Sequence, residues 1–170
     1  QSLIGKRAPL LELSSIDGSV VTLFPFGPSS DSRLTDEVSL SGEAAAPKFS
    51  VLYFYDTDCA KCRLETMFLN AFLAAKTYPV DVYAVYAGDN QGEWLSYVAE
   101  NLAGAVHLWD PDLKSDFQRK YGVTQTPRMF LISPDGVVLG RGLDTQALDL
   151  MLKDIQIQIL KQFLLVPISC

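Results

Sequence analysis

The most constraining feature of the sequence is a nearly unbroken apolar and aromatic run, Phe49 to Tyr55, which is followed closely by Cys59-Ala60-Lys61-Cys62. Such a run predicts a strand that is covered on both faces, in the middle of a sheet. The polar residues at 56–58 supply an N-cap for the next element. Behind the cysteines, apolar residues recur at three- and four-residue steps, which predicts a helix as far as Ala75. Its predicted buried face consists of Leu64, Met67, Phe68, Ala71, Phe72 and Ala75.

Two cysteines separated by two residues, where a buried strand gives way to a helix, are suited to thiol–disulfide exchange. Cys59 is expected at the first turn of the helix, where unpaired N–H groups and the helix dipole favour a thiolate. Cys62, one turn further along, can then displace a partner from a mixed disulfide. Zinc sites share this spacing but usually take four Cys or His ligands. The chain otherwise offers only His107 and Cys170, so we predict no metal site and expect a packing or solvated histidine and a bystander thiol.

Composition excludes several classes of function. Of the 170 residues, 48% are hydrophobic and 20% charged, which is typical of one globular domain with a full core. The net charge is −6 and the basic residues are not clustered, so nucleic acid is not expected as a partner. There is no apolar stretch long enough to span a bilayer, and the sequence opens at Gln1. We expect any export signal, lipid anchor or membrane anchor to lie outside this chain.

Periodicity and turn residues predict the other elements. Short apolar stretches on either side of the turn-like Asp17-Gly18 predict a β-hairpin near the N-terminus. Residues 25–47 are rich in Gly, Pro, Ser, Asp and Ala and predict a surface loop insertion. Asp110 is predicted to cap a helix with the stripe Leu113, Phe117 and Tyr121, which ends at Gly122. The remaining predictions are a buried strand at 80–87, a helix at 92–102, a short strand at 105–109 and a hairpin at 128–132 and 137–140.

The last predicted helix, 145–163, is more apolar than one buried face requires. One stripe consists of Ala147, Leu148, Met151, Leu152, Ile155 and Ile159, and a second of Leu150, Ile157, Leu160 and Leu164. The C-terminal tail (164–170) is the simplest cover for the second stripe, while a dimer or a missing partner stays open. The whole order of elements predicts a single α/β domain over 1–170, with a mixed central sheet and helices on both faces.

Several motifs together resemble a known family. They are Gly5-Lys6-Arg7-Ala8-Pro9, the Asp17-Gly18 turn, the cysteine pair after its strand, the segment from Tyr121 to Pro127, and the Pro134-Asp135-Gly136 hairpin. In order and spacing these resemble the thioredoxin-like thiol:disulfide oxidoreductases, in particular the exported branch typified by cytochrome c maturation reductases and envelope lipoproteins. The resemblance covers nearly the whole chain. It implies a thioredoxin-like three-layer sandwich and a location in the periplasm or cell envelope.

The resemblance also implies roles for three further residues. Thr126 and Pro127 match the family's cis-proline pair, which faces the cysteines and lines the groove for an extended substrate backbone. Glu65 resembles a proton-handling glutamate that raises the pKa of the cysteines, and its alternative is a solvated first-turn carboxylate. The sequence departs from the family pattern in three places. Asp58 replaces a Trp, Tyr53 replaces a buried acid, and the interior of the cysteine motif is Ala-Lys.

The predicted function is the reduction of protein disulfides, in which Cys59 attacks, Cys62 resolves and Glu65 helps to move protons. Such an enzyme needs no bound cofactor, only protein thiol or disulfide clients and an upstream redox partner that reduces it again. One alternative is a peroxiredoxin-like thiol peroxidase, although Thr57 lies two residues before Cys59 and not three. The other is a thioredoxin-fold module that binds a client without catalysis. The sequence leaves the direction of electron flow, the clients and the oligomeric state open.

Overall fold

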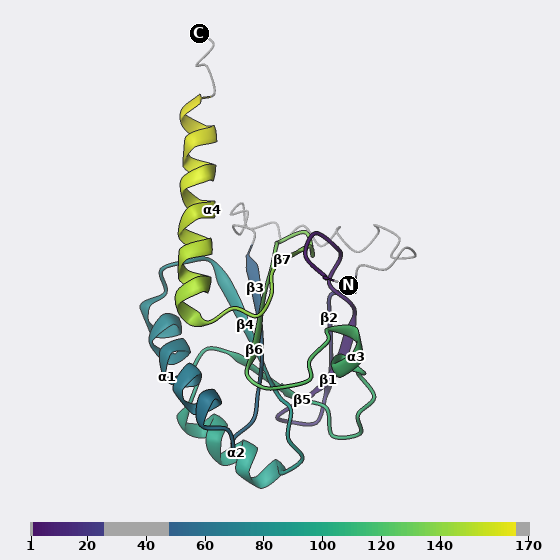
Figure 1. Ribbon diagram of the computed structural model, residues 1–170. Coiled ribbons are helices and arrows are strands. Elements are labelled where there is room, and N and C mark those ends of the chain that lie inside the picture. The colour runs from purple at the N-terminus through teal and green to yellow at the C-terminus, as the bar shows by residue number, and fades with distance from the viewer. Residues whose placement is uncertain (1, 26–47, 166–170) are drawn as a thin grey trace, which may run out of the picture.

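The structure is a computed structural model that describes residues 2–25 and 48–165 (Figure 1). Nearly all of the predicted loop insertion at 25–47 therefore lies outside the described residues. The same holds for Cys170 and for the predicted tail beyond Leu165.

The described residues form seven strands and four helices. In chain order they are β1 (Leu11–Ser15), β2 (Val20–Leu23), β3 (Phe49–Tyr55), α1 (Ala60–Ala75), β4 (Val80–Tyr86), α2 (Gln91–Glu100), β5 (Val106–Trp109), α3 (Phe117–Lys120), β6 (Arg128–Ile132), β7 (Val138–Gly140) and α4 (Thr145–Leu165). The N-terminal hairpin, the central strand β3 and the C-terminal helix are all confirmed.

A single mixed sheet carries the fold, with the strand order β2-β1-β5-β4-β3-β6-β7. Strands β3, β4 and β5 are parallel, and β6 pairs antiparallel with β3, so that Phe54 lies opposite Arg128. The residues just before β6 therefore meet the residues just after β3 at one edge of the sheet. This register places Thr126 and Pro127 beside the cysteine motif.

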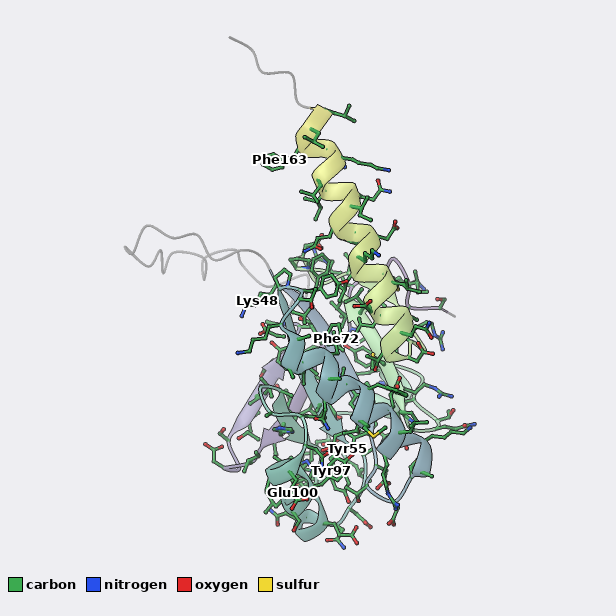
Figure 2. The ribbon with its side chains drawn as sticks, turned by 90° about the vertical axis from the view of Figure 1, so that its left-hand side faces the viewer. Lys48, Tyr55, Phe72, Tyr97, Glu100 and Phe163 are labelled. Atoms are coloured by element: carbon green, nitrogen blue, oxygen red, sulfur yellow. The ribbon has the colours of Figure 1, made fainter. Side chains whose placement is uncertain are left out.

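Three of the four helices cover the same face of the sheet. The chain steps in one direction from β3 through α1 to β4 and through α2 to β5, and right-handed crossovers put both helices on one side. Leu69 of α1, Trp94 of α2 and Leu148 of α4 accordingly belong to one buried cluster. The ring of Tyr55 in this cluster lies 5.5 Å from that of Tyr97 of α2, and Figure 2 shows the two side chains close together.

The opposite face is covered by α3 and the segment after it. Phe117 of α3 stacks on Phe54 of β3 at 4.8 Å, and Tyr121 packs beside them. Alternation along β3 directs Leu52 and Phe54 to this side and Tyr53 and Tyr55 to the other. The predicted mixed α/β sheet with helices on both faces is confirmed.

The predicted buried face of α1 is wrong except at Phe72, which packs partly against the core. Leu64, Met67 and Phe68 are 53%, 59% and 49% exposed, whereas the helix buries Cys62, Thr66 and Leu69. The sequence of α1 contains two stripes at helical spacing, and the prediction chose the more apolar one. Packing against the sheet selects the other stripe, which leaves an apolar face of α1 at the surface.

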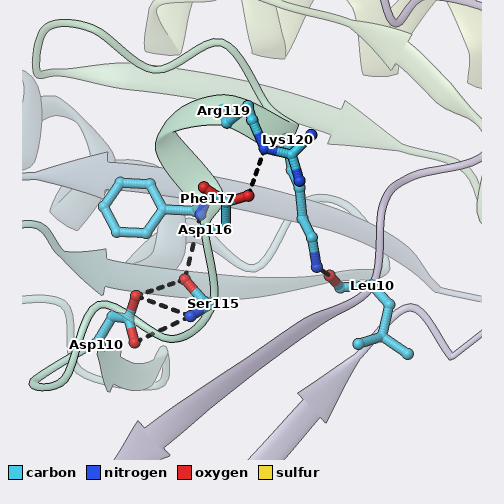
Figure 3. Close-up of polar contacts among 7 residues, drawn as sticks. All are labelled: Leu10, Asp110, Ser115, Asp116, Phe117, Arg119 and Lys120. Carbon is cyan, nitrogen blue, oxygen red and sulfur yellow. Dashed lines mark hydrogen bonds and ion pairs between the residues drawn. The ribbon is translucent and has the colours of Figure 1, made fainter.

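The helix predicted from Asp110 is also wrong over its first half, because α3 contains only Phe117–Lys120. Asp110 does not cap a helix. Its carboxylate accepts hydrogen bonds from the backbone N–H and hydroxyl of Ser115, which closes a tight loop (Figure 3). Leu113 is 69% exposed and has a φ of 56°, so the expected stripe does not form there. The left-handed residue that comes after α3 is Gly122, as predicted.

Helix α4 packs on the sheet only through its N-terminal half. Leu148 and Leu152 are buried, which confirms the centre of the first predicted stripe, whereas the C-terminal half extends away from the sheet (Figure 1). The second predicted stripe, including Leu150 and Ile157, is exposed in the described part of the chain. Among the described residues, none of the helices combines the length and apolarity needed to cross a membrane.

Candidate active site

The cysteine motif begins α1 directly behind the central strand. Cys59 is itself the N-cap residue, with extended backbone angles, and its Sγ accepts a hydrogen bond from the backbone N–H of Cys62 at 3.4 Å. The predicted cap at 56–58 is therefore wrong by one residue. Both cysteines are free thiols, and the first sulfur occupies the position where helix N–H groups converge.

The environment of Cys59 favours its thiolate. Desolvation raises the pKa of the thiol, but hydrogen bonds from Cys62 and from the backbone of Lys61 outweigh it and hold the pKa below its ordinary value. The side chain is only half-buried. A partly exposed, low-pKa sulfur at a helix start is the arrangement of a nucleophilic cysteine.

Cys62 has the opposite character. It is fully buried, and desolvation raises its pKa to about 11, although hydrogen bonds from Asp56 and Thr126 partly oppose this. The N–H of Asp56 donates to its Sγ at 3.5 Å. At neutral pH, Cys62 therefore holds its proton while Cys59 is the readier nucleophile.

The Thr126-Pro127 pair lies against this dithiol. The peptide bond between the two residues is cis, and the Sγ of Cys59 donates to the carbonyl oxygen of Thr126 at 3.6 Å. The two residues are 67 positions apart in the chain, and the antiparallel pairing of β6 with β3 brings them together. Both Thr126 and Pro127 are half-buried, and they lie at the same edge of the sheet as the sulfur of Cys59.

A buried polar pair that the sequence did not predict lies beneath Cys62. The hydroxyl of Tyr53 donates to the carbonyl oxygen of Cys62 at 3.2 Å and lies 3.0 Å from the Oγ1 of Thr66. Burial raises the pKa of Tyr53, so the phenol stays neutral. The available signal was the position of Thr66, a polar residue four after Cys62 and hence on the same face of the helix.

Glu65 lies on α1 but reaches toward another helix. Its Oε1 accepts a hydrogen bond from the backbone N–H of Thr145 at 2.9 Å, at the first residue of α4. Desolvation, together with the nearby charge of Asp144, raises the pKa of this carboxyl. No hydrogen bond joins it to either cysteine within the described part of the chain. Its predicted role in proton transfer stays a prediction.

The region around the dithiol also matches a known family in sequence. A family profile described as Thioredoxin-like matches residues 47–138, which is more than half of the chain and contains both cysteines. The chain belongs to the Thioredoxin-like family. No curated protein matches this thioredoxin-like chain significantly in sequence.

Solved structures share the fold of this thioredoxin-like protein. The thioredoxin domain of a thiol-disulfide oxidoreductase from Bacteroides vulgatus superposes with a TM-score of 0.68 at 19% identity, over 91% of this chain and 99% of that one. A thiol-disulfide oxidoreductase from Bacteroides fragilis gives 0.67 at 18%, over 88% and 99%. A thiol:disulfide interchange protein from a Bacteroides species gives 0.65 at 21%, over 89% and 88%. The predicted thioredoxin-like fold is confirmed.

The chemically reactive groups of this thioredoxin-like site are the two thiols. Across residues 2–25 and 48–165, no three His, Cys, Asp or Glu side chains come together as a metal site. His107 lies half-buried in β5, where desolvation lowers its pKa. The groups that surround the dithiol are backbone donors, the cis-proline segment and the Tyr53–Thr66 pair. In this setting the pKa of Cys59 is lowered and that of the buried Cys62 is raised.

Proposed function

We propose that this protein reduces disulfide bonds in other proteins through Cys59 and Cys62. The single observation that carries the proposal is the difference between the two sulfurs. Cys59 is half-buried with a lowered pKa, and Cys62 is fully buried with a pKa raised to about 11. Exchange needs this division, because the first thiol must attack as a thiolate and the second must stay protonated until a mixed disulfide has formed.

The reaction balances in two exchanges. The Cys59 thiolate attacks one sulfur of a client disulfide, forms a mixed disulfide and releases the other client sulfur as a thiolate. Cys62 then loses its proton and attacks the Sγ of Cys59, which expels the second client sulfur. The client gains two electrons and two protons in total, and the enzyme is left with a Cys59–Cys62 disulfide. An upstream dithiol must then reduce it.

One neighbouring feature supports attack by Cys59. The carbonyl oxygen of Thr126, beside the Cys59 sulfur, is an acceptor that an extended client backbone can meet at this edge of the sheet. Glu65 is included as a proton-handling group only through the family resemblance, since its carboxylate bonds to Thr145.

The peroxidase alternative is less favoured. The hydroxyl of Thr57 donates to Glu93 at 3.3 Å and not to Cys59.

The motif resemblance also supports a proposal for the cellular location of the protein. The opening Gly5–Pro9 and the Pro134-Asp135-Gly136 hairpin resemble the exported reductases, so we infer an activity in the periplasm or cell envelope, with protein thiols and disulfides as partners. Fractionation of cells that express the full gene tests this. Recovery of the protein only in the cytoplasm would contradict it.

The activity itself is tested by reduction of insulin disulfides with dithiothreitol as the electron donor. The wild type should accelerate insulin precipitation, and Cys59→Ser should not. Cys62→Ser should trap clients as mixed disulfides through Cys59, and the matched Cys59→Ser variant should trap none. Equal trapping by both variants, or faster alkylation of Cys62 than of Cys59, would show that the roles are wrongly assigned. Hydrogen peroxide turnover without insulin reduction would favour the peroxidase alternative.

A further inference from the structure

The C-terminal half of α4 carries a large apolar surface that no other part of the described chain covers. Every residue from 156 to 165 is exposed. Phe163, Leu164 and Leu165 at the end are 80%, 84% and 80% exposed. Figures 1 and 2 show this part of the helix standing clear of the sheet, with Phe163 near its tip. Apolar patches of this size on a folded protein usually mark an interaction site.

A groove with one apolar and one polar wall lies at the other end of the same helix. It has a volume of about 450 Å³ and runs between α1 and the start of α4. Phe68 and Phe72 of α1 form its apolar wall, Gln146 and Asp149 of α4 lie across from them, and Glu65 lines its end nearer to the dithiol. Phe68 is 49% exposed, so the groove is open to a partner.

One face of α4 connects the groove to the exposed end. Gln146, Leu150, Ile157 and Leu164 are spaced by four, seven and seven residues, which keeps them on a single side of the helix. Leu160 lies beside them. Leu150, Ile157, Leu160 and Leu164 on this face form the second apolar stripe, with Lys153 between the first two, and the heptad spacing is that of a seam between two helices. The stripe begins one turn after Gln146, which lines the groove, and ends at the helix tip.

We propose that two copies of the chain pair antiparallel along this stripe, so that the α4 tip of each copy lies in the α1–α4 groove of the other. With Ile157 near the twofold axis, Leu164 of one copy lies beside Leu150 of the other. The separation between residues 150 and 164 is about 21 Å along a helix, so the tip reaches the level of the groove. A single twofold axis brings the stripe and tip of each copy against the stripe and groove of the other, so both surfaces are covered at once. A second copy of the chain therefore fits better than an unrelated protein.

The charges on the helix flanks favour the antiparallel direction. Asp154 and Lys161 are seven residues apart and lie on the same flank of the stripe. In the antiparallel pair, Asp154 of one copy faces Lys161 of the other, and this occurs twice. A parallel pair would instead bring Asp149 of one copy toward Asp154 of the other, and like charges repel.

The stripe exposes large apolar side chains along its whole length, because Leu150, Leu160 and Leu164 are 58%, 60% and 84% exposed. The groove lies two to three turns along α1 from Cys59. The dithiol therefore stays accessible in the dimer, and pairing does not depend on the proposed reductase activity.

The pairing is tested by measuring the mass of the reduced full-length chain in solution, by sedimentation or light scattering. Chain concentrations of 1–100 μM cover the range around a micromolar Kd. A particle of twice 18.7 kDa is expected. Leu160→Gln combined with Leu164→Gln should weaken association at least tenfold, and Phe68→Gln on the groove side should weaken it as well. Gln158→Ala, on the same exposed helix but off the stripe, is the matched control and should stay dimeric. Circular dichroism verifies that each variant is folded.

Cysteine cross-linking tests the direction, in a background in which the three native cysteines are serine. Ile157→Cys should form a disulfide-linked dimer on oxidation, because position 157 meets itself near the axis. Leu164→Cys should not, because it meets position 150. A monomer at 100 μM overturns the proposal, as does a dimer that both the stripe and groove variants leave intact. Efficient cross-linking of Leu164→Cys to itself overturns the antiparallel arrangement.

Discussion

Replacing Tyr53 with phenylalanine removes one hydroxyl from a fully buried position beneath the active-site helix. That hydroxyl has two partners, the carbonyl oxygen of Cys62 at 3.2 Å and the Oγ1 of Thr66 at 3.0 Å. Thr66 is only 1% exposed, so water cannot replace the lost partner. The ring itself stays in place, stacked on Tyr55 at 5.5 Å. The substitution therefore isolates the hydrogen bonds from the packing.

The expected cost comes from the unmade hydrogen bonds. Leaving buried polar partners unsatisfied costs about 1–3 kcal/mol, and the carbonyl of Cys62 also serves the helix, so we expect Tyr53→Phe to lower the free energy of unfolding by about 1–2 kcal/mol. Thr66→Val, which keeps the shape, should cost about the same. The double variant replaces both polar groups by apolar ones and should cost less than the sum of the single changes, by about 1 kcal/mol.

Urea unfolding of the reduced protein, followed by tryptophan fluorescence, measures these differences. Tyr83→Phe is the matched control. Tyr83 is half-buried in β4, and its hydroxyl makes no hydrogen bond with the described residues, so this change should alter stability by less than about 0.5 kcal/mol. If the effects of Tyr53→Phe and Thr66→Val simply add, the two hydroxyls do not depend on each other and the argument for a coupled pair beneath Cys62 is refuted. The rate of Cys59 alkylation should stay unchanged in all these variants.

The reduced protein should lose stability as the pH rises from 9 toward 11. The raised pKa of Cys62 keeps its proton in the folded state after the unfolded chain has released it, and Cys62→Ala should flatten this part of the pH–stability curve. Glu65→Gln should cost less than Glu65→Ala at neutral pH, because the amide still accepts from Thr145. Because the pKa of Glu65 is raised in the folded state, this carboxyl stabilises the fold at low pH, and that stabilisation is lost as the pH rises through its folded-state pKa. The free energy of unfolding of Glu65→Gln, measured at several pH values, should therefore increase relative to that of the wild type as the pH rises. Leu69→Ala should cost about 2–5 kcal/mol and Leu64→Ala under about 1 kcal/mol, and equal costs would contradict the face of α1 that the structure buries.

The sequence alone determined most of the elements and the position of the dithiol. The run from Phe49 to Tyr55 is apolar on both faces, so it predicts a central strand whatever surrounds it. Turn residues such as Asp17-Gly18 separate hairpin strands by local backbone preference. The dithiol was recognised for the same reason, because two cysteines one helical turn apart need no distant residue to define their spacing. These signals all lie within one element or its immediate neighbours.

The tertiary structure decided which faces and which partners these elements use. The sequence of α1 fits two burial faces, and only packing on the sheet selects the one with Cys62 and Leu69 and leaves Leu64 outside. The bond of Glu65 to Thr145 spans 80 positions. Residue spacing along one helix fixes an angle around that helix but says nothing of how the helix is rotated against its neighbours, and the contacts that fix this rotation come from strands and helices far away in the chain.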